Sequence, residues 1–183
     1  MPQITPQSFK YPLFDVYLDY LKTAFGLSIG LGGLVYGLNN TFSQICFSAI
    51  LIIFIIFGFH SLRRHRTRVT LDNQQIEITD FKQRKILFKD IQNIELRYYG
   101  RPVKDKENDQ KPKGVLHLVL KNEEQKLTFD SNLYGFKYLV WATILFAKEY
   151  NLPLDPSTIG NMLDIGLDPE GSSEMPDPKM SGI

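Results

Sequence analysis

Few side chains in this sequence could carry out metal or nucleophilic chemistry, and they are scattered. The histidines are His60, His65 and His117, and the single cysteine is Cys46. His60 and His65 lie five residues apart with no Cys, Asp or Glu beside them to complete a metal site. The sequence contains no nucleophile elbow, phosphate-binding loop or HExxH motif. We therefore expect no catalytic residue, no metal site, no cofactor and no enzymatic activity.

The distribution of charge points instead to a membrane segment. Between Lys22 and Arg63 there are 40 consecutive uncharged residues. As helix they would extend about 60 Å, twice the roughly 30 Å thickness of a bilayer core. Polar residues 39–41 predict a turn between a first span over residues 22–38 and a second over residues 43–60. The first span is marginal alone because it is rich in glycine.

Basic residues gather at one end of this predicted hairpin. Lys22 precedes the first span, the turn carries no Lys or Arg, and a basic cluster follows the second span: Arg63, Arg64, Arg66 and Arg68. The positive-inside rule therefore predicts a two-pass membrane protein with both termini in the cytoplasm. The cluster sets topology alone, or it also contacts anionic lipid headgroups.

Four glycines of the first span share one helix face. Gly26, Gly30, Gly33 and Gly37 follow each other at intervals of four, three and four residues. Such small residues allow two helix backbones to approach closely. We expect this face to pack on the second span of the same chain, and a homo-oligomer formed through the hairpin is the alternative.

Residues 1–21 precede the hairpin and predict an amphipathic segment at the membrane surface. After Pro12, apolar residues recur at intervals of three and four, and the segment is rich in Phe and Tyr, which favour the headgroup region. A cytoplasmic extension of the first membrane helix is the alternative interpretation.

Residues 63–150 predict a cytoplasmic domain of antiparallel strands that ends in a helix. Apolar and polar residues alternate in six segments: 68–72, 76–79, 85–89, 94–98, 116–121 and 126–130. A helix is expected over residues 133–150, with Leu139, Ala142, Phe146 and Tyr150 in the core. The charged loop 101–114 is a candidate interaction loop through five basic residues: Arg101, Lys104, Lys106, Lys111 and Lys113. These are interleaved with acids and lack aromatic neighbours, so no nucleic-acid binding is expected.

The strand pattern resembles that of bacterial membrane proteins with a pleckstrin-homology-like (PH-like) domain. The residues that carry the resemblance are 68–72, 75–79 and 86–96, including the step Asp90-Ile91-Gln92-Asn93-Ile94. It covers residues 22–150 and implies an open barrel of six or seven antiparallel strands capped by a C-terminal helix. It also implies an interaction or lipid-contact module. The first hairpin loop, residues 72–74, lacks the basic residues of members that bind phosphoinositides.

Residues 151–183 predict an acidic, disordered tail. They hold five Pro, four Gly and six Asp or Glu against one Lys. Ile159, Met162, Leu163, Ile165 and Leu167 form an exception that could dock on the domain or on a partner. The expected chain thus has four parts: residues 1–21, 22–62, 63–150 and 151–183.

Two functions fit this organisation. In the first, the hairpin anchors a non-catalytic adaptor whose PH-like domain binds another protein of the inner membrane. In the second, the basic cluster and the loop sense an anionic lipid surface.

Overall fold

The computed structural model describes residues 4, 6–37, 40–100, 114–170 and 174–180. The chain forms two compact units. One consists of Met1–Lys10 together with Arg68–Ile183, and we call it the sheet domain. The other, Tyr11–Thr67, is the helical hairpin.

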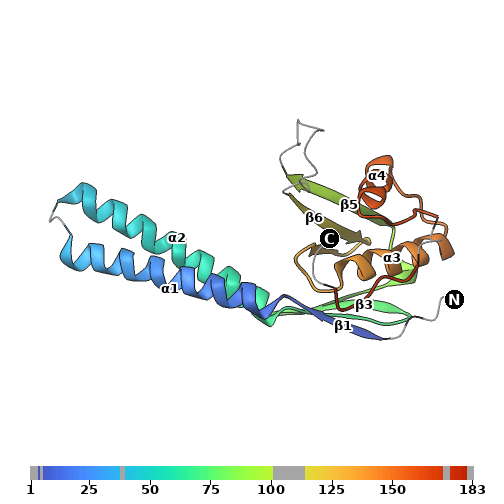
Figure 1. Cartoon of the computed structure of the whole chain (residues 1–183), viewed down its shortest axis with the longest axis horizontal. Coiled ribbons are helices and arrows are strands. Elements are labelled where there is room, and N and C mark those ends of the chain that lie inside the picture. The colour runs from blue at the N-terminus through green and yellow to red at the C-terminus, as the bar shows by residue number, and fades with distance from the viewer. Residues whose placement is uncertain (1–3, 5, 38–39, 101–113, 171–173, 181–183) are drawn as a thin grey trace. The chain divides into compact units, whose positions relative to one another are not determined.

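The helical hairpin consists of two long helices, α1 (Leu13–Tyr36) and α2 (Thr41–Arg66), which pack against each other (Figure 1). Asn40 begins α2 as its N-cap, since its side-chain oxygen accepts a hydrogen bond from the Ser43 amide at 2.8 Å. α1 runs without interruption through residues 21 and 22. The helix bounds therefore agree with the alternative in which residues 13–21 extend the first long helix.

The sheet domain has an α+β fold with two antiparallel sheets (Figure 1). The first contains, in order, β1 (Gln7–Lys10), β2 (Arg68–Leu71), β3 (Gln75–Thr79) and β4 (Gln83–Leu87). After a short 3-10 turn, Phe88–Asp90, the second contains β5 (Asn93–Gly100), β6 (Gly114–Lys121) and β7 (Lys126–Asp130). Two helices follow, α3 (Phe136–Glu149) and α4 (Pro156–Asp164).

Each of the six predicted segments overlaps an observed strand, and the alternation follows the sheet faces. The segment 85–89 is corrected at its end, because β4 stops at Leu87 and Phe88–Asp90 form the 3-10 turn. Val69, Leu71, Ile76, Ile78 and Ile86 are buried, and polar residues between them are exposed or half-buried. The turn after β2 forms because the Asp72 carboxylate accepts hydrogen bonds from the amides of Gln74 and Gln75.

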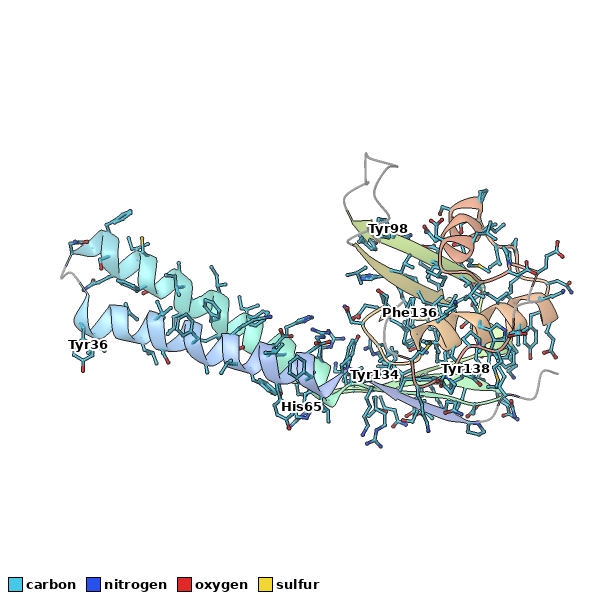
Figure 2. All side chains as sticks on the ribbon, in the orientation of Figure 1. Tyr36, His65, Tyr98, Tyr134, Phe136 and Tyr138 are labelled. Carbon is cyan, nitrogen blue, oxygen red and sulfur yellow. The ribbon has the colours of Figure 1, made fainter. Side chains whose placement is uncertain are left out.

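Helix α3 completes the core of the sheet domain. The Phe146 ring stacks on Phe88 with centroids 3.7 Å apart, and Leu139 and Ala142 are fully buried. Phe136 and Tyr138 lie in the first half of the same helix (Figure 2). The prediction for Tyr150 is wrong: it follows the helix and is exposed.

Strand β1 was not predicted, and it changes the topology. It pairs with β2 in a register that joins Phe9 to Val69 and Lys10 to Arg68. Phe9 is buried and lies 5.9 Å from the Tyr138 ring. The helical hairpin is therefore an insertion between two strands that pair with each other.

The predicted disordered tail is also corrected. Residues 156–164 form α4, and Met162, Ile165 and Leu167 are buried in the sheet domain. Further along the chain, the Met180 carbonyl accepts a hydrogen bond from the Gly135 amide at 2.8 Å. The apolar residues of this segment thus dock on the chain's own domain.

Candidate interaction surfaces

The glycine face of α1 is filled by side chains of α2. A Cβ atom added at Gly26 would lie 2.2 Å from the Phe54 ring, and one at Gly33 would lie 2.0 Å from the Phe47 ring. At Gly30 the added Cβ would lie 3.2 Å from Leu51.

Gly37, at the end of this face, and Gly32, beside the face, differ in their surroundings. An added Cβ at Gly37 would meet the Gly33 carbonyl at 2.1 Å and Phe47 at 3.1 Å, whereas one at Gly32 would meet nothing within 4 Å. Within the chain, Gly26, Gly30 and Gly33 thus lie against side chains of α2, and Gly37 lies near Phe47 and the carbonyl of Gly33.

Both helices of the hairpin expose apolar side chains along their length. Phe14, Phe25, Val35, Phe42 and Ile56 are each more than 60% exposed. By length and composition, α2 is the one helix among the described residues that could cross a membrane. The uncharged part of α1, Thr23–Tyr36, has 14 described residues and measures about 21 Å, which is short of a bilayer core.

The polar end of the hairpin holds part of the basic cluster in place. The Arg64 guanidinium forms an ion pair with Asp19 at 3.0 Å and lies 4.8 Å from the centre of the Tyr11 ring. Both side chains of the ion pair are largely buried, at 19% and 13% exposure. Arg64 thus joins α2 to α1, while Arg63 and Arg66 are exposed.

Near this end a hydrogen bond also joins the two helices, whereas Arg68 lies outside the hairpin. The Tyr20 hydroxyl and His65 Nδ1 form a hydrogen bond at 3.0 Å; both residues are drawn as sticks in Figure 2, where His65 is labelled. Arg68, the last member of the predicted cluster, belongs to β2 in the sheet domain and is exposed.

In the sheet domain, the outer edge of β5 is covered by α4. The Leu96 amide donates a hydrogen bond to Thr158 Oγ1 at 2.9 Å, and Asn161 Nδ2 donates one to the Leu96 carbonyl at 2.6 Å. Thr158 is 1% exposed. These residues lie more than 60 positions from Leu96, so the sequence carried no signal for the contact.

A carboxylate begins α4 and fixes its first turn. Asp155 accepts hydrogen bonds from the Thr158 amide and the Ser157 hydroxyl. These hydrogen bonds lower the pKa of the Asp155 carboxyl, and the bond with Thr158 has the larger effect. The negative charge at the start of α4 is thereby stabilised.

The outer face of the β5–β6 pair carries a polar cluster. Lys121 Nζ lies 2.5 Å from Glu95, which Arg97 also contacts. The hydrogen bond from Lys121 and the charge of Arg97 lower the pKa of the Glu95 carboxyl. His117, predicted on this outer face, is half-buried with its ring 4.7 Å from Tyr99. Within this cluster, the carboxylate of Glu95 is thus paired with the ammonium of Lys121 and the guanidinium of Arg97.

A hollow lies beside α3. Its volume is about 430 Å³, and apolar side chains form most of its wall: Ile144, Ala147, Leu152, Leu154 and Pro169. Lys148, Asn151 and Glu170 also line it. The Lys148 ammonium donates a hydrogen bond to the Glu170 carbonyl at 2.7 Å, which ties the C-terminal segment to α3.

The basic residues of the predicted interaction loop belong to a stretch that the structure does not describe. Arg101, Lys104, Lys106, Lys111 and Lys113 all lie outside the described residues. Within the part of the chain that the structure describes, no three His, Cys, Asp or Glu side chains are grouped as metal ligands would be.

No protein-family model, curated protein or solved structure matches this chain. A function proposed for this chain therefore rests on the contacts described above.

Proposed function

We propose that this protein is a membrane-anchored, non-catalytic adaptor whose cytoplasmic sheet domain binds another protein of the same membrane. The observation that carries the proposal is the contrast between the two units. The sheet domain buries its own apolar core, whereas the hairpin leaves large apolar side chains exposed on both helices. A bilayer is the environment in which such a surface is stable.

A two-pass arrangement fits the contacts inside the hairpin. α2 has the length and composition of a span, and α1, which is too short in its uncharged part, has its glycine face against α2. Packing of this kind supports insertion of a marginal helix beside a strong one. The basic end of α2 supports a cytoplasmic location for both termini in a bacterial inner membrane.

The resemblance to PH-like domains gains support from the strand arrangement. Four strands and then three form two antiparallel sheets, and α3 follows the last strand. We propose that these elements form the open barrel and capping helix of that family, with the hairpin inserted after the first strand.

Anchoring supplies a physical reason for partner binding by a small domain. Confinement to one membrane raises the effective concentration of a domain for partners in that membrane, so a weak contact suffices. Two surfaces of the sheet domain suit a partner: the outer edge of β5, where α4 bonds the main chain of Leu96, and the largely apolar hollow beside α3.

The test compares photo-crosslinking of three forms of the chain in native membranes. One is the full chain, and another has residues 11–67 replaced by a four-residue glycine-containing linker. This linker can close β1 to β2 because Lys10 and Arg68 are cross-strand partners. The third form carries an unrelated membrane hairpin in place of residues 11–67 and is the control for tethering alone.

We expect one major crosslinked protein with the full chain and much less with the linker form. If the form with the control hairpin is crosslinked as well as the full chain, tethering to the membrane alone explains the loss in the linker form. If it is not, α1 and α2 themselves contact the partner. Equal capture by all three forms would contradict a role for the anchor. Steady, protein-dependent chemical turnover by the purified chain would reject the adaptor proposal.

A second candidate, sensing of an anionic lipid surface, is favoured by the exposure of Arg63 and Arg66 at the end of α2. Each cation near an anionic surface contributes about 1 kcal/mol. Replacement of both Arg63 and Arg66 by Gln should then reduce contact between the full chain and phosphatidylglycerol in mixed vesicles. Fluorescently labelled lipid reports this contact. An unchanged lipid preference would remove this candidate.

A further inference from the structure

Leu96 lies at an edge of the three-stranded sheet. Its strand, β5, pairs with β6 on one side, where Leu96 faces Leu118 in the register. Both main-chain groups of Leu96 are instead bonded to α4. In an antiparallel ladder, the residues two positions away, Ile94 and Tyr98, direct their main-chain groups to the same side.

Helix α4 supplies the two hydrogen bonds that a neighbouring strand would supply. Thr158 accepts from the Leu96 amide and Asn161 donates to the Leu96 carbonyl, whereas an added strand would offer a carbonyl and an amide to the same residue. We propose that α4 is a built-in competitor for this edge, which otherwise binds an extended segment of the partner protein. The proposal rests on the partner-binding function proposed above.

The construction of α4 suits a cover that can be displaced. It has nine residues, and Gly160 in its middle weakens the helix. Buried Met162 and Ile165 hold it on the domain, while Leu163 is 59% exposed. Among the residues that the structure describes, the hydrogen bonds from α4 to β5 reach Leu96, whereas an extended segment of four or five residues would bond two or three alternate residues. The incoming segment can thus replace the lost hydrogen bonds.

Two substitutions should shift the competition in opposite directions. Thr158→Val removes the acceptor of the Leu96 amide and loosens the cover. Gly160→Ala strengthens the helix without a clash, because a Cβ at this exposed position meets nothing within 4 Å. Thr158→Ser keeps the hydroxyl and is the matched control.

The first measurement needs no partner. Amide hydrogen exchange of residues 93–98 is followed by mass spectrometry on the full chain in detergent micelles. We expect Gly160→Ala to slow exchange at Leu96 about fourfold, the factor given by the difference in helix propensity between Gly and Ala. Thr158→Val should speed exchange at least tenfold, and Thr158→Ser should match the unaltered chain. Equal exchange rates in all four proteins would contradict the proposal that α4 covers the edge of β5.

The second measurement tests the competition. A photo-crosslinking amino acid replaces Arg97, which lies on β5 and is partly exposed, and the full chain is irradiated in native membranes. The yield with the crosslinked protein should rise for Thr158→Val and fall about fourfold for Gly160→Ala. Equal yields, with exchange rates that differ as expected, would overturn competition while leaving partner binding intact. No crosslink from position 97 in any variant, while the three-form comparison still captures a partner, would overturn the competitor alone. No capture in either experiment would reject the proposed function as well.

Discussion

Substitution of Gly33 tests the packing of the hairpin most directly. An added Cβ would lie 2.0 Å from the Phe47 ring, where ordinary contacts begin at 3.4 Å. Gly33→Ala therefore forces the ring or the helices to move by about 1.4 Å, the difference between these two distances. Overpacking of this kind costs about 1–3 kcal/mol, which corresponds to a roughly fivefold to hundredfold loss of the packed state. Gly32→Ala is the matched control, because its Cβ meets nothing within 4 Å.

Disulfide formation between the two helices measures this packed state. The Cβ positions of residues 30 and 51 lie 3.2 Å apart, close to the 3.5–4.5 Å typical of disulfides. In a Cys46→Ser chain, Gly30→Cys and Leu51→Cys should therefore crosslink rapidly within one chain in membranes. Adding Gly33→Ala should slow the reaction, and Gly32→Ala should not.

A rescue variant separates the clash from other effects. Phe47→Ala should restore the crosslinking rate in the Gly33→Ala chain, since it removes the ring that the new methyl group meets. Equal rates for the Gly33 and Gly32 variants would refute the packing described here. A crosslinked product of twice the mass would show that the glycine face joins two chains.

Three further outcomes are expected in the sheet domain. Phe146→Asp should prevent cooperative thermal unfolding, because a buried carboxylate on the Phe88 stack costs several kcal/mol; an unshifted circular-dichroism melt would contradict this. The linker form lacking residues 11–67 should be soluble and folded, and removal of β1 from it should lower its melting temperature by several degrees. Stability should fall as pH drops below about 4.5, because the folded-state pKa of Glu95 lies below that value; Glu95→Gln should flatten this dependence in urea titrations.

The alternating strands were predictable because each has one buried and one solvated face. β1 was not, since Phe9 is its one apolar residue and the segment therefore shows no alternation. The aromatic residues that follow it dominate the local pattern and favour a membrane-surface interpretation. Pairing with β2 across the whole hairpin supplies the information that the segment itself lacks.

The glycine face was predictable for a different reason: spacing alone places residues on one side of a helix. The cover on β5 was not predictable. Its hydrogen bonds join Leu96 to residues 62 and 65 positions later, and Thr158 and Asn161 are ordinary helix-start and surface residues in the sequence. The composition of the tail predicted disorder because it averages over the few apolar residues that dock.

The insertion of the hairpin between β1 and β2 has a consequence for biosynthesis. β1 leaves the ribosome before β2, yet it lacks this neighbour until β2 has been made after the intervening Tyr11–Thr67. Closing a flexible segment of that length costs about 3–4 kcal/mol of chain entropy. A formed hairpin removes most of this cost, because the Arg64 contacts with Tyr11 and Asp19 bring its two ends together. Formation of the hairpin and completion of the four-stranded sheet are therefore coupled steps, because the contacts that close the hairpin also bring β1 and β2 within reach of each other.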